Sequence, residues 1–113
     1  MSNEVILSKT YELLKETITT VNKFPRSFKF TLADRIQNLL SDILEQLIEA
    51  FYTAKNFKVG ILQRVNISLE QLRYYYRLSF ELGLYNSVKY NLFAEKVNEI
   101  GRMTGGWIKS LKR

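Results

Sequence analysis

The chain has 113 residues, of which 46% are hydrophobic and 25% charged, a composition that predicts one soluble globular domain spanning residues 1–113. It contains no cysteine and no histidine, which excludes disulfides, thiolate or imidazole metal sites and histidine-dependent catalysis. Its formal net charge of +6 indicates a polyanionic partner, unless the charge serves only to keep the protein soluble.

The first predicted helix runs from about Glu4 to Asn22. Pro25 disfavours helical geometry at Phe24 and removes a backbone donor, so a turn is expected at residues 23–27. Apolar residues recur at steps of three and four along one face of this helix, which predicts its buried side: Leu7, Tyr11, Leu14, Ile18 and Val21.

The second predicted helix begins near Thr31, a competent N-cap, and continues to about Tyr52. A broad apolar stripe predicts its buried face: Leu32, Ile36, Leu39, Leu40, Ile43, Leu44, Leu47, Ile48 and Phe51. The carboxylates lie on the opposite side: Asp34, Asp42, Glu45 and Glu49.

The third predicted helix spans roughly Val59 to Leu82 and is expected to stop at Gly83, and Asn86 or Ser87 then caps a fourth helix. The predicted core positions of the third helix are Leu62, Val65, Leu69, Leu72 and Tyr76, and those of the fourth are Phe93, Val97, Ile100, Trp107 and Leu111. Four amphipathic helices with short connections predict an all-α fold, an antiparallel four-helix bundle.

The third helix carries a second apolar side, because Ile67, Tyr74 and Leu78 cluster opposite its core stripe. A helix that is apolar on two opposite faces usually buries both, so we expect a second copy of the chain to cover this side. The alternative is that these are scattered surface hydrophobes.

Arg73 and Arg77 lie one turn apart between the two apolar sides of the third helix. Guanidinium groups spaced in this way suit phosphates or a partner's carboxylates. The alternative is a solvated stripe in which Glu70 pairs with Arg73 and Glu81 pairs with Arg77.

Three glycines fall within six residues near the end of the fourth helix, and each costs about 1 kcal/mol relative to alanine in a helix. Ala94, Gly101 and Gly105 share one side, where they would form a shallow groove that lets another helix approach closely. The alternative is that Gly105 and Gly106 cap the helix, although the apolar pattern resumes at Trp107.

Other function classes find little support in the sequence. The helically spaced carboxylate pairs (Glu12/Glu16, Glu45/Glu49 and Glu95/Glu99) lack the histidines of di-metal bundles, so no metal, cofactor or catalytic residue is expected. No apolar run approaches the roughly 18 residues of a membrane span, and Met-Ser-Asn-Glu is unlike a signal peptide. We therefore expect a cytoplasmic, non-enzymatic protein that does not engage a membrane.

Two blocks of the sequence carry a resemblance to a known family: Leu-Arg-Tyr-Tyr-Tyr-Arg-Leu over residues 72–78 and Glu-Ile-Gly-Arg-Met-Thr-Gly-Gly-Trp-Ile over residues 99–108. Shorter matches are Phe-Pro-Arg-Ser at 24–27, Leu-Ile-Glu-Ala at 47–50 and Arg-x-Asn at 64–66. Together they resemble the accessory variability determinant proteins of diversity-generating retroelements over roughly residues 11–108.

The resemblance implies a four-helix-bundle protomer that assembles into a ring-like homopentamer without catalysis of its own. It further implies binding to the element's reverse transcriptase and to structured template RNA, and also to DNA, in support of mutagenic retrohoming. By position, Arg73 and Arg77 are the first candidates for nucleic-acid or polymerase contact, and Arg102 and Lys109 the second. Gly101, Gly105 and Trp107 match the terminal motif, whose implied role is helix packing within or between subunits.

Charge distribution agrees with a nucleic-acid partner, because residues 54–113 hold eleven cations and four anions whereas residues 1–53 hold six and seven. Two alternatives remain. The related bundle proteins of ribosomal-RNA intervening sequences typically carry a proline and a closing glycine in the second helix, both absent from residues 40–50 here. The other alternative is a purely protein-binding helical adaptor with an acidic partner.

Overall fold

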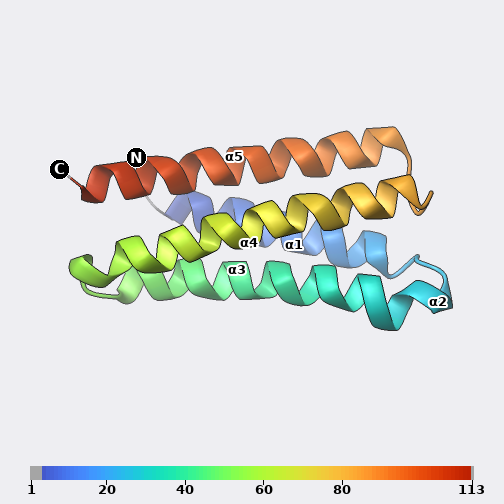
Figure 1. The fold of residues 1–113 in the computed structure, drawn as a ribbon, viewed down its shortest axis with the longest axis horizontal. Coiled ribbons are helices and arrows are strands. Elements are labelled where there is room, and N and C mark those ends of the chain that lie inside the picture. The colour runs from blue at the N-terminus through green and yellow to red at the C-terminus, as the bar shows by residue number, and fades with distance from the viewer. Residues whose placement is uncertain (1–3, 113) are drawn as a thin grey trace.

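The structure is a computed structural model that describes residues 4–112 of the chain. The described helices follow in the order α1 (Glu4–Val21), α2 (Arg26–Phe28), the π-helical segment η1 (Lys29–Ala33), α3 (Asp34–Tyr52), α4 (Lys55–Glu81) and α5 (Ser87–Leu111), with no strand among residues 4–112. Each of the four long helices runs antiparallel to the one before it in the chain (Figure 1). Helices α1 and α4 each pack against both α3 and α5. The predicted all-α, antiparallel four-helix bundle is therefore confirmed.

The bundle has two ends, which we name by their residues. The Pro25 end holds the α1–α3 connection, residues 22–33, and the α4–α5 turn, residues 82–86 (Figure 1). The Trp107 end holds the start of α1, the α3–α4 connection and the end of α5. Along its longest axis the molecule measures 46 Å. Among the described residues, no helix combines the length and the apolar character needed to span a bilayer.

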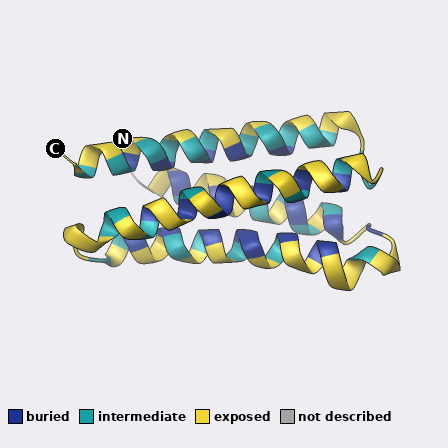
Figure 2. Cartoon of the chain, in the orientation of Figure 1, coloured by how far each residue is buried: buried dark blue, intermediate teal, exposed yellow. Residues whose placement is uncertain are grey.

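The core follows the apolar stripes of α3, α4 and α5. All five predicted core residues of α4 are buried, as are Phe93, Val97, Ile100 and Trp107 of α5, whereas Leu111 is partly buried. In α3 most of the predicted stripe is buried, but Ile48 is 41% exposed and lies at its edge. Figure 2 shows the buried residues on the helix sides that face one another.

The predicted buried face of α1 is displaced by one residue from the observed one, and of its predicted members only Val21 is buried. The buried residues are Ile6, Thr10, Leu13, Thr17 and Val21, whereas Tyr11 is 53% exposed and Leu7, Leu14 and Ile18 are only partly buried. The sequence pattern missed this face because two of its members are threonines. Both buried hydroxyls are hydrogen-bonded, because Thr10 donates to the Ile6 carbonyl at 2.7 Å and Thr17 shares a hydrogen bond with the Tyr76 hydroxyl at 2.6 Å.

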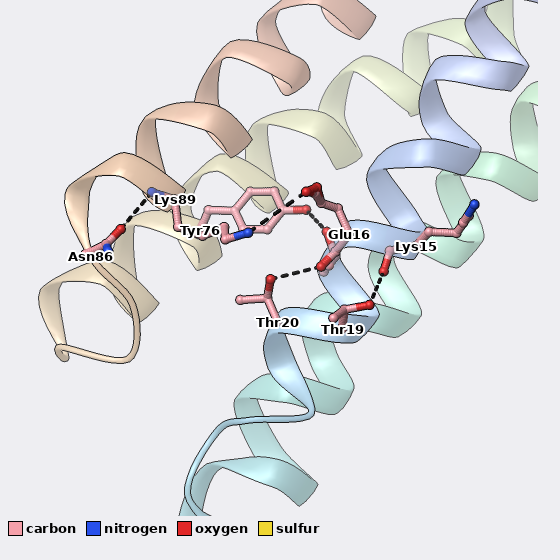
Figure 3. Close-up of polar contacts among 8 residues, drawn as sticks. Lys15, Glu16, Thr19, Thr20, Tyr76, Asn86 and Lys89 are labelled. Atoms are coloured by element: carbon pink, nitrogen blue, oxygen red, sulfur yellow. Dashed lines mark hydrogen bonds and ion pairs between the residues drawn. The ribbon is translucent and has the colours of Figure 1, made fainter.

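Tyr76 joins α4 to α1 at this buried position. Its side chain points from α4 toward α1 (Figure 3), and its ring stacks on Phe93 of α5 with centroids 4.6 Å apart. Burial raises the pKa of the Tyr76 hydroxyl above that of an exposed tyrosine, so it stays protonated at physiological pH. Nearby, the ammonium group of Lys89 in α5 lies 3.9 Å from the Glu16 carboxylate of α1.

Two helix starts differ from the prediction. Helical structure on the α3 side begins at Arg26, directly after Pro25, rather than near Thr31, because a proline with its fixed φ suits the entrance of a helix. Thr31 lies inside η1, where its hydroxyl donates to the Ser27 carbonyl at 3.4 Å instead of capping a helix. At the other end, α4 begins at Lys55 rather than near Val59.

Lys58 explains how α4 begins so soon after α3. Its ammonium group donates to the Ala50 carbonyl at 2.6 Å and to the Phe51 carbonyl at 3.1 Å, and so satisfies carbonyls that the end of α3 leaves without partners. The α4–α5 turn follows the prediction. Gly83 adopts a φ of 76°, a left-handed conformation that favours glycine, and the Asn86 side chain accepts a hydrogen bond from the Lys89 backbone at 2.9 Å.

Candidate functional site

The outer side of α4 carries three exposed apolar side chains. Ile67, Tyr74 and Leu78 are 61%, 64% and 43% exposed, on the side of the helix turned away from Leu69, Leu72 and Tyr76. Because the bundle itself does not cover these three side chains, they are available to a second molecule. The role predicted for them, contact with another copy, stays a prediction.

Arg73 and Arg77 both form ion pairs within α4. The Arg73 Nη1 atom lies 2.6 Å from a Glu70 carboxylate oxygen, and Arg77 Nε lies 2.9 Å from a Glu81 carboxylate oxygen. These are the pairs of the alternative interpretation. The hydrogen bond with Glu81 and the negative charge of that residue raise the pKa of Arg77. A phosphate approaching either arginine therefore meets a guanidinium group that already has a carboxylate beside it.

Arg73 also links α4 to α5. Its Nε atom donates to the Asn98 Oδ1 atom at 3.1 Å, so the guanidinium lies across an open groove of about 440 Å³ between the two helices. The groove is lined by Asn66, Leu69, Glu70, Arg73, Asn98, Gly101 and Arg102. Asn98 was not among the predicted site residues, and only the helix pairing brings it to Arg73.

Gly101 makes room for this guanidinium. A methyl group at residue 101 would lie 3.2 Å from Arg73 Nη2, which is closer than ordinary van der Waals contact. Within the protomer, the group that approaches Gly101 is therefore a charged side chain and not the backbone of another helix. Gly105 and Gly106 differ, because nothing lies within 4 Å of a methyl group built at either residue.

The end of α5 continues as a helix through its glycines. Because α5 extends to Leu111, the alternative in which Gly105 and Gly106 cap the helix is wrong. Trp107 anchors this last stretch, since it is only 6% exposed and the Lys58 ammonium lies 5.9 Å from the centroid of its ring. The helix passes Gly105 and Gly106 with bare backbone on its outer side.

Arg102 and Lys109 are exposed and form no ion pair with any residue in the range 4–112. They lie seven residues apart, which is about two helical turns, so they project from the same side of α5 with Gly106 between them. Of the four predicted cations, these two form no ion pair, whereas Arg73 and Arg77 do. Glu95 and Glu99 nevertheless line an open pocket together with Arg102.

A second group of unpaired cations was missed by the sequence analysis. Lys23, Arg26 and Lys29 at the Pro25 end are exposed and form no ion pair within the described part of the chain. The signal was present in the sequence, because residues 17–33 contain these three cations and no carboxylate. It was hidden by the balanced charge of the first half as a whole.

Alanine substitutions at Gly101 and Gly105 are expected to differ in their effect on the free energy of unfolding. Gly105→Ala should stabilise the protein by about 1 kcal/mol, because alanine favours the helix and its methyl group meets open space. Gly101→Ala should gain less, because its methyl group pushes against the Arg73 guanidinium, which hydrogen bonds to Glu70 and Asn98 hold in place. Urea unfolding of both variants measures the difference.

The control repeats Gly101→Ala in a protein that also carries Arg73→Ala. There the glycine substitution should raise the free energy of unfolding by the full amount, because the guanidinium is absent. Equal gains at both glycines in the wild-type background would contradict this account of Gly101. A loss of stability at Gly105 that grows with protein concentration would show that a second subunit packs against that residue.

No group of three or more Asp or Glu residues that could hold a metal ion occurs within residues 4–112, and the whole chain lacks His and Cys. A family model described as bAvd-like matches residues 4–111, which is nearly the whole chain. No curated protein matches the chain.

Proposed function

Because the chain belongs to the bAvd-like family, the accessory variability determinant family, we propose that it serves a diversity-generating retroelement as a non-catalytic accessory protein. In this role it binds the reverse transcriptase and structured template RNA, and so supports mutagenic retrohoming. It works in the cytoplasm as a homopentamer.

The observation that carries the nucleic-acid part of this proposal is the set of unpaired cations. Arg102 and Lys109 project from α5 on either side of Gly106, where a methyl group built on the glycine would have no neighbour within 4 Å. Assembly multiplies this charge, because five copies at +6 carry a formal charge of +30. Weak phosphate contacts repeated around a ring add by avidity and weaken with salt.

The exposed outer side of α4 supports the assembly part of the proposal. Ile67, Tyr74 and Leu78 extend over several turns of one helix, and burying them between subunits removes apolar surface from water. The ion-paired Arg73 and Arg77 flank this side, where they would contact the polymerase or a neighbouring subunit, and the carboxylates beside them weaken their attraction for a phosphate.

Two double variants that remove equal charge test where RNA binds. Both Arg102→Gln with Lys109→Gln and Arg73→Gln with Arg77→Gln lower the formal charge per chain from +6 to +4. The first pair should weaken binding of a structured RNA more and should reduce the slope of log affinity against log salt by about one to two. Fluorescence anisotropy over a salt series measures both quantities.

Equal losses in the two double variants would show that only the overall field matters and would contradict the assignment to α5. A wild-type protein that binds no structured RNA at low salt would refute the nucleic-acid part of the proposed function. Light scattering on the purified chain tests the pentamer separately.

A further inference from the structure

The α1–α3 connection concentrates positive charge at the Pro25 end of the bundle. Lys23, Arg26 and Lys29 lie within seven residues, all three are exposed, and none forms an ion pair with a described residue. The nearest carboxylates along the chain are Glu16, which lies beside Lys89, and Asp34, which begins α3 after η1. At the α4–α5 turn, Glu81 pairs with Arg77. None of the three cations is neutralised by an ion pair, although Asp34, which is exposed and forms no ion pair among the described residues, lies five residues after Lys29.

Phe30 adds an exposed aromatic ring to the same segment. Its exposed fraction is 75%, whereas Phe24 is 3% exposed and Phe28 is partly buried against the core. Phe24 also lies 6.2 Å from Tyr85 of the α4–α5 turn, measured between ring centroids. Two of the three phenylalanines thus fix the connection to the bundle, and the third points to solvent. We call Lys23, Arg26, Lys29 and Phe30 the Phe30 patch.

The backbone beneath the patch is unusual. Lys29 and Phe30 open the π-helical segment η1, which separates the short helix α2 from α3. π-Helical turns are rare and occur frequently at functional sites. A regular continuation of α3 would not require one, so the geometry of this connection is consistent with a surface kept for binding.

From these features we infer that the Phe30 patch binds a single-stranded segment of nucleic acid, with Phe30 stacking on an unpaired base and the three cations contacting the flanking phosphates. Proteins that bind single strands combine cations that follow the backbone with aromatic rings on which bases stack. This inference rests on the proposed function, because it assigns a second contact to the same RNA, at the end of the bundle remote from Lys109.

A single strand fits this patch better than a duplex or a protein does. Bases in a duplex are already stacked on their neighbours and cannot stack on a side chain. An acidic protein segment would satisfy the three cations, but it has no need of a flat aromatic ring beside them. The combination of free charge and one projecting ring is what indicates an unpaired base.

The test uses the full-length protein, an oligouridine of about 20 nucleotides and a blunt RNA duplex of the same length. Phe30→Ala should weaken binding of oligouridine roughly 10-fold and leave binding of the duplex within about 2-fold, because only the single strand offers a base for stacking. Phe30→Trp should retain or strengthen binding of oligouridine. Tyr52→Ala, which removes another highly exposed ring at the Trp107 end, is the matched control and should have no effect.

The triple variant K23Q/R26Q/K29Q should lower the slope of log affinity against log salt by about two for oligouridine, as expected for three lost phosphate contacts on a single strand. Its control is K9Q/K15Q/K89Q, which removes three ion-paired cations and gives the same formal charge of +3. This control should change the slope much less. Circular dichroism and unfolding confirm that each variant folds.

Two outcomes overturn the inference alone. In the first, neither Phe30→Ala nor the triple variant of Lys23, Arg26 and Lys29 weakens binding of oligouridine. If Arg102→Gln with Lys109→Gln still weakens binding of structured RNA, the proposed function stands without this inference. The other is a triple variant that loses oligouridine and polyglutamate equally while Phe30→Ala has no effect, which identifies a general anion surface. A wild-type protein that binds neither RNA refutes the proposed function and this inference together.

Discussion

Substituting glutamate for Tyr74 and Leu78 is expected to convert the proposed pentamer into monomers and to lower the affinity for structured RNA at least about 100-fold. Both side chains are exposed in the protomer, so the substitutions should not disturb its core. A contact between subunits at this side of α4 would have to bury the added carboxylates without partners, which is strongly unfavourable. Once the ring is lost, the RNA can no longer contact several subunits at once.

Light scattering coupled to size-exclusion chromatography measures the mass, and anisotropy measures RNA binding. The control is Asn38→Glu with Asn91→Glu, which makes the same change of charge at exposed residues of α3 and α5 and should keep the oligomer. A wild-type chain that is monomeric at micromolar concentration, or a Tyr74 and Leu78 variant that keeps the wild-type mass, would contradict the proposed assembly through α4.

The second large effect is expected at Trp107. Trp107→Ala should lower the free energy of unfolding by about 3–5 kcal/mol, because it removes the largest side chain of the chain from a site where it is only 6% exposed. The ring also lies beneath Lys58, whose ammonium group satisfies the last carbonyls of α3. Losing Trp107 therefore loosens the contact between the end of α5 and the α3–α4 connection.

Urea unfolding followed by circular dichroism measures this loss, and Trp107→Phe, which keeps a buried ring, should lose clearly less. Lys58→Met separates the two contributions, since it removes the hydrogen bonds to the Ala50 and Phe51 carbonyls but leaves Trp107 in place. A loss below about 1 kcal/mol for Trp107→Ala would show that the end of α5 is not anchored by this residue.

The comparison of expectation with structure is most informative for α1. Its apolar residues repeat at helical spacing, yet the buried face contains Thr10 and Thr17 and leaves Tyr11 exposed. Two of the five buried positions of α1 carry threonine and the positions beside them are apolar, so the apolar pattern selects the adjacent face. On α4 and α5 the buried polar residues Ser68, Ser79 and Thr104 lie among enough apolar ones that the pattern still identifies the buried face. Here the Thr17 hydroxyl is satisfied by Tyr76, 59 residues further along the chain, and no local pattern contains that information.

The candidate site shows the same limit. Arg73 and Arg77 were chosen for their spacing on one helix, but their value for binding a phosphate depends on Glu70 and Glu81, which are paired with them in the structure. Arg102 and Lys109 have no such partner, and Lys23, Arg26 and Lys29 gain interest because the structure pairs none of them with a carboxylate of the described residues. Residue type identified the cations, and three-dimensional neighbours decided which of them remain free.

By itself, the sequence determined the fold class, the core of α4 and most of the cores of α3 and α5, the turn at Gly83 and the family, since helical periodicity, capping residues and short motifs are local properties of the chain. Tertiary structure decided which face of α1 is buried and that α4 begins at Lys55, where Lys58 bonds to the end of α3. It also decided that Gly101 leaves space for Arg73, and which cations form ion pairs. The physical reason is that burial and electrostatic pairing depend on groups distant in sequence, which meet only when the helices pack.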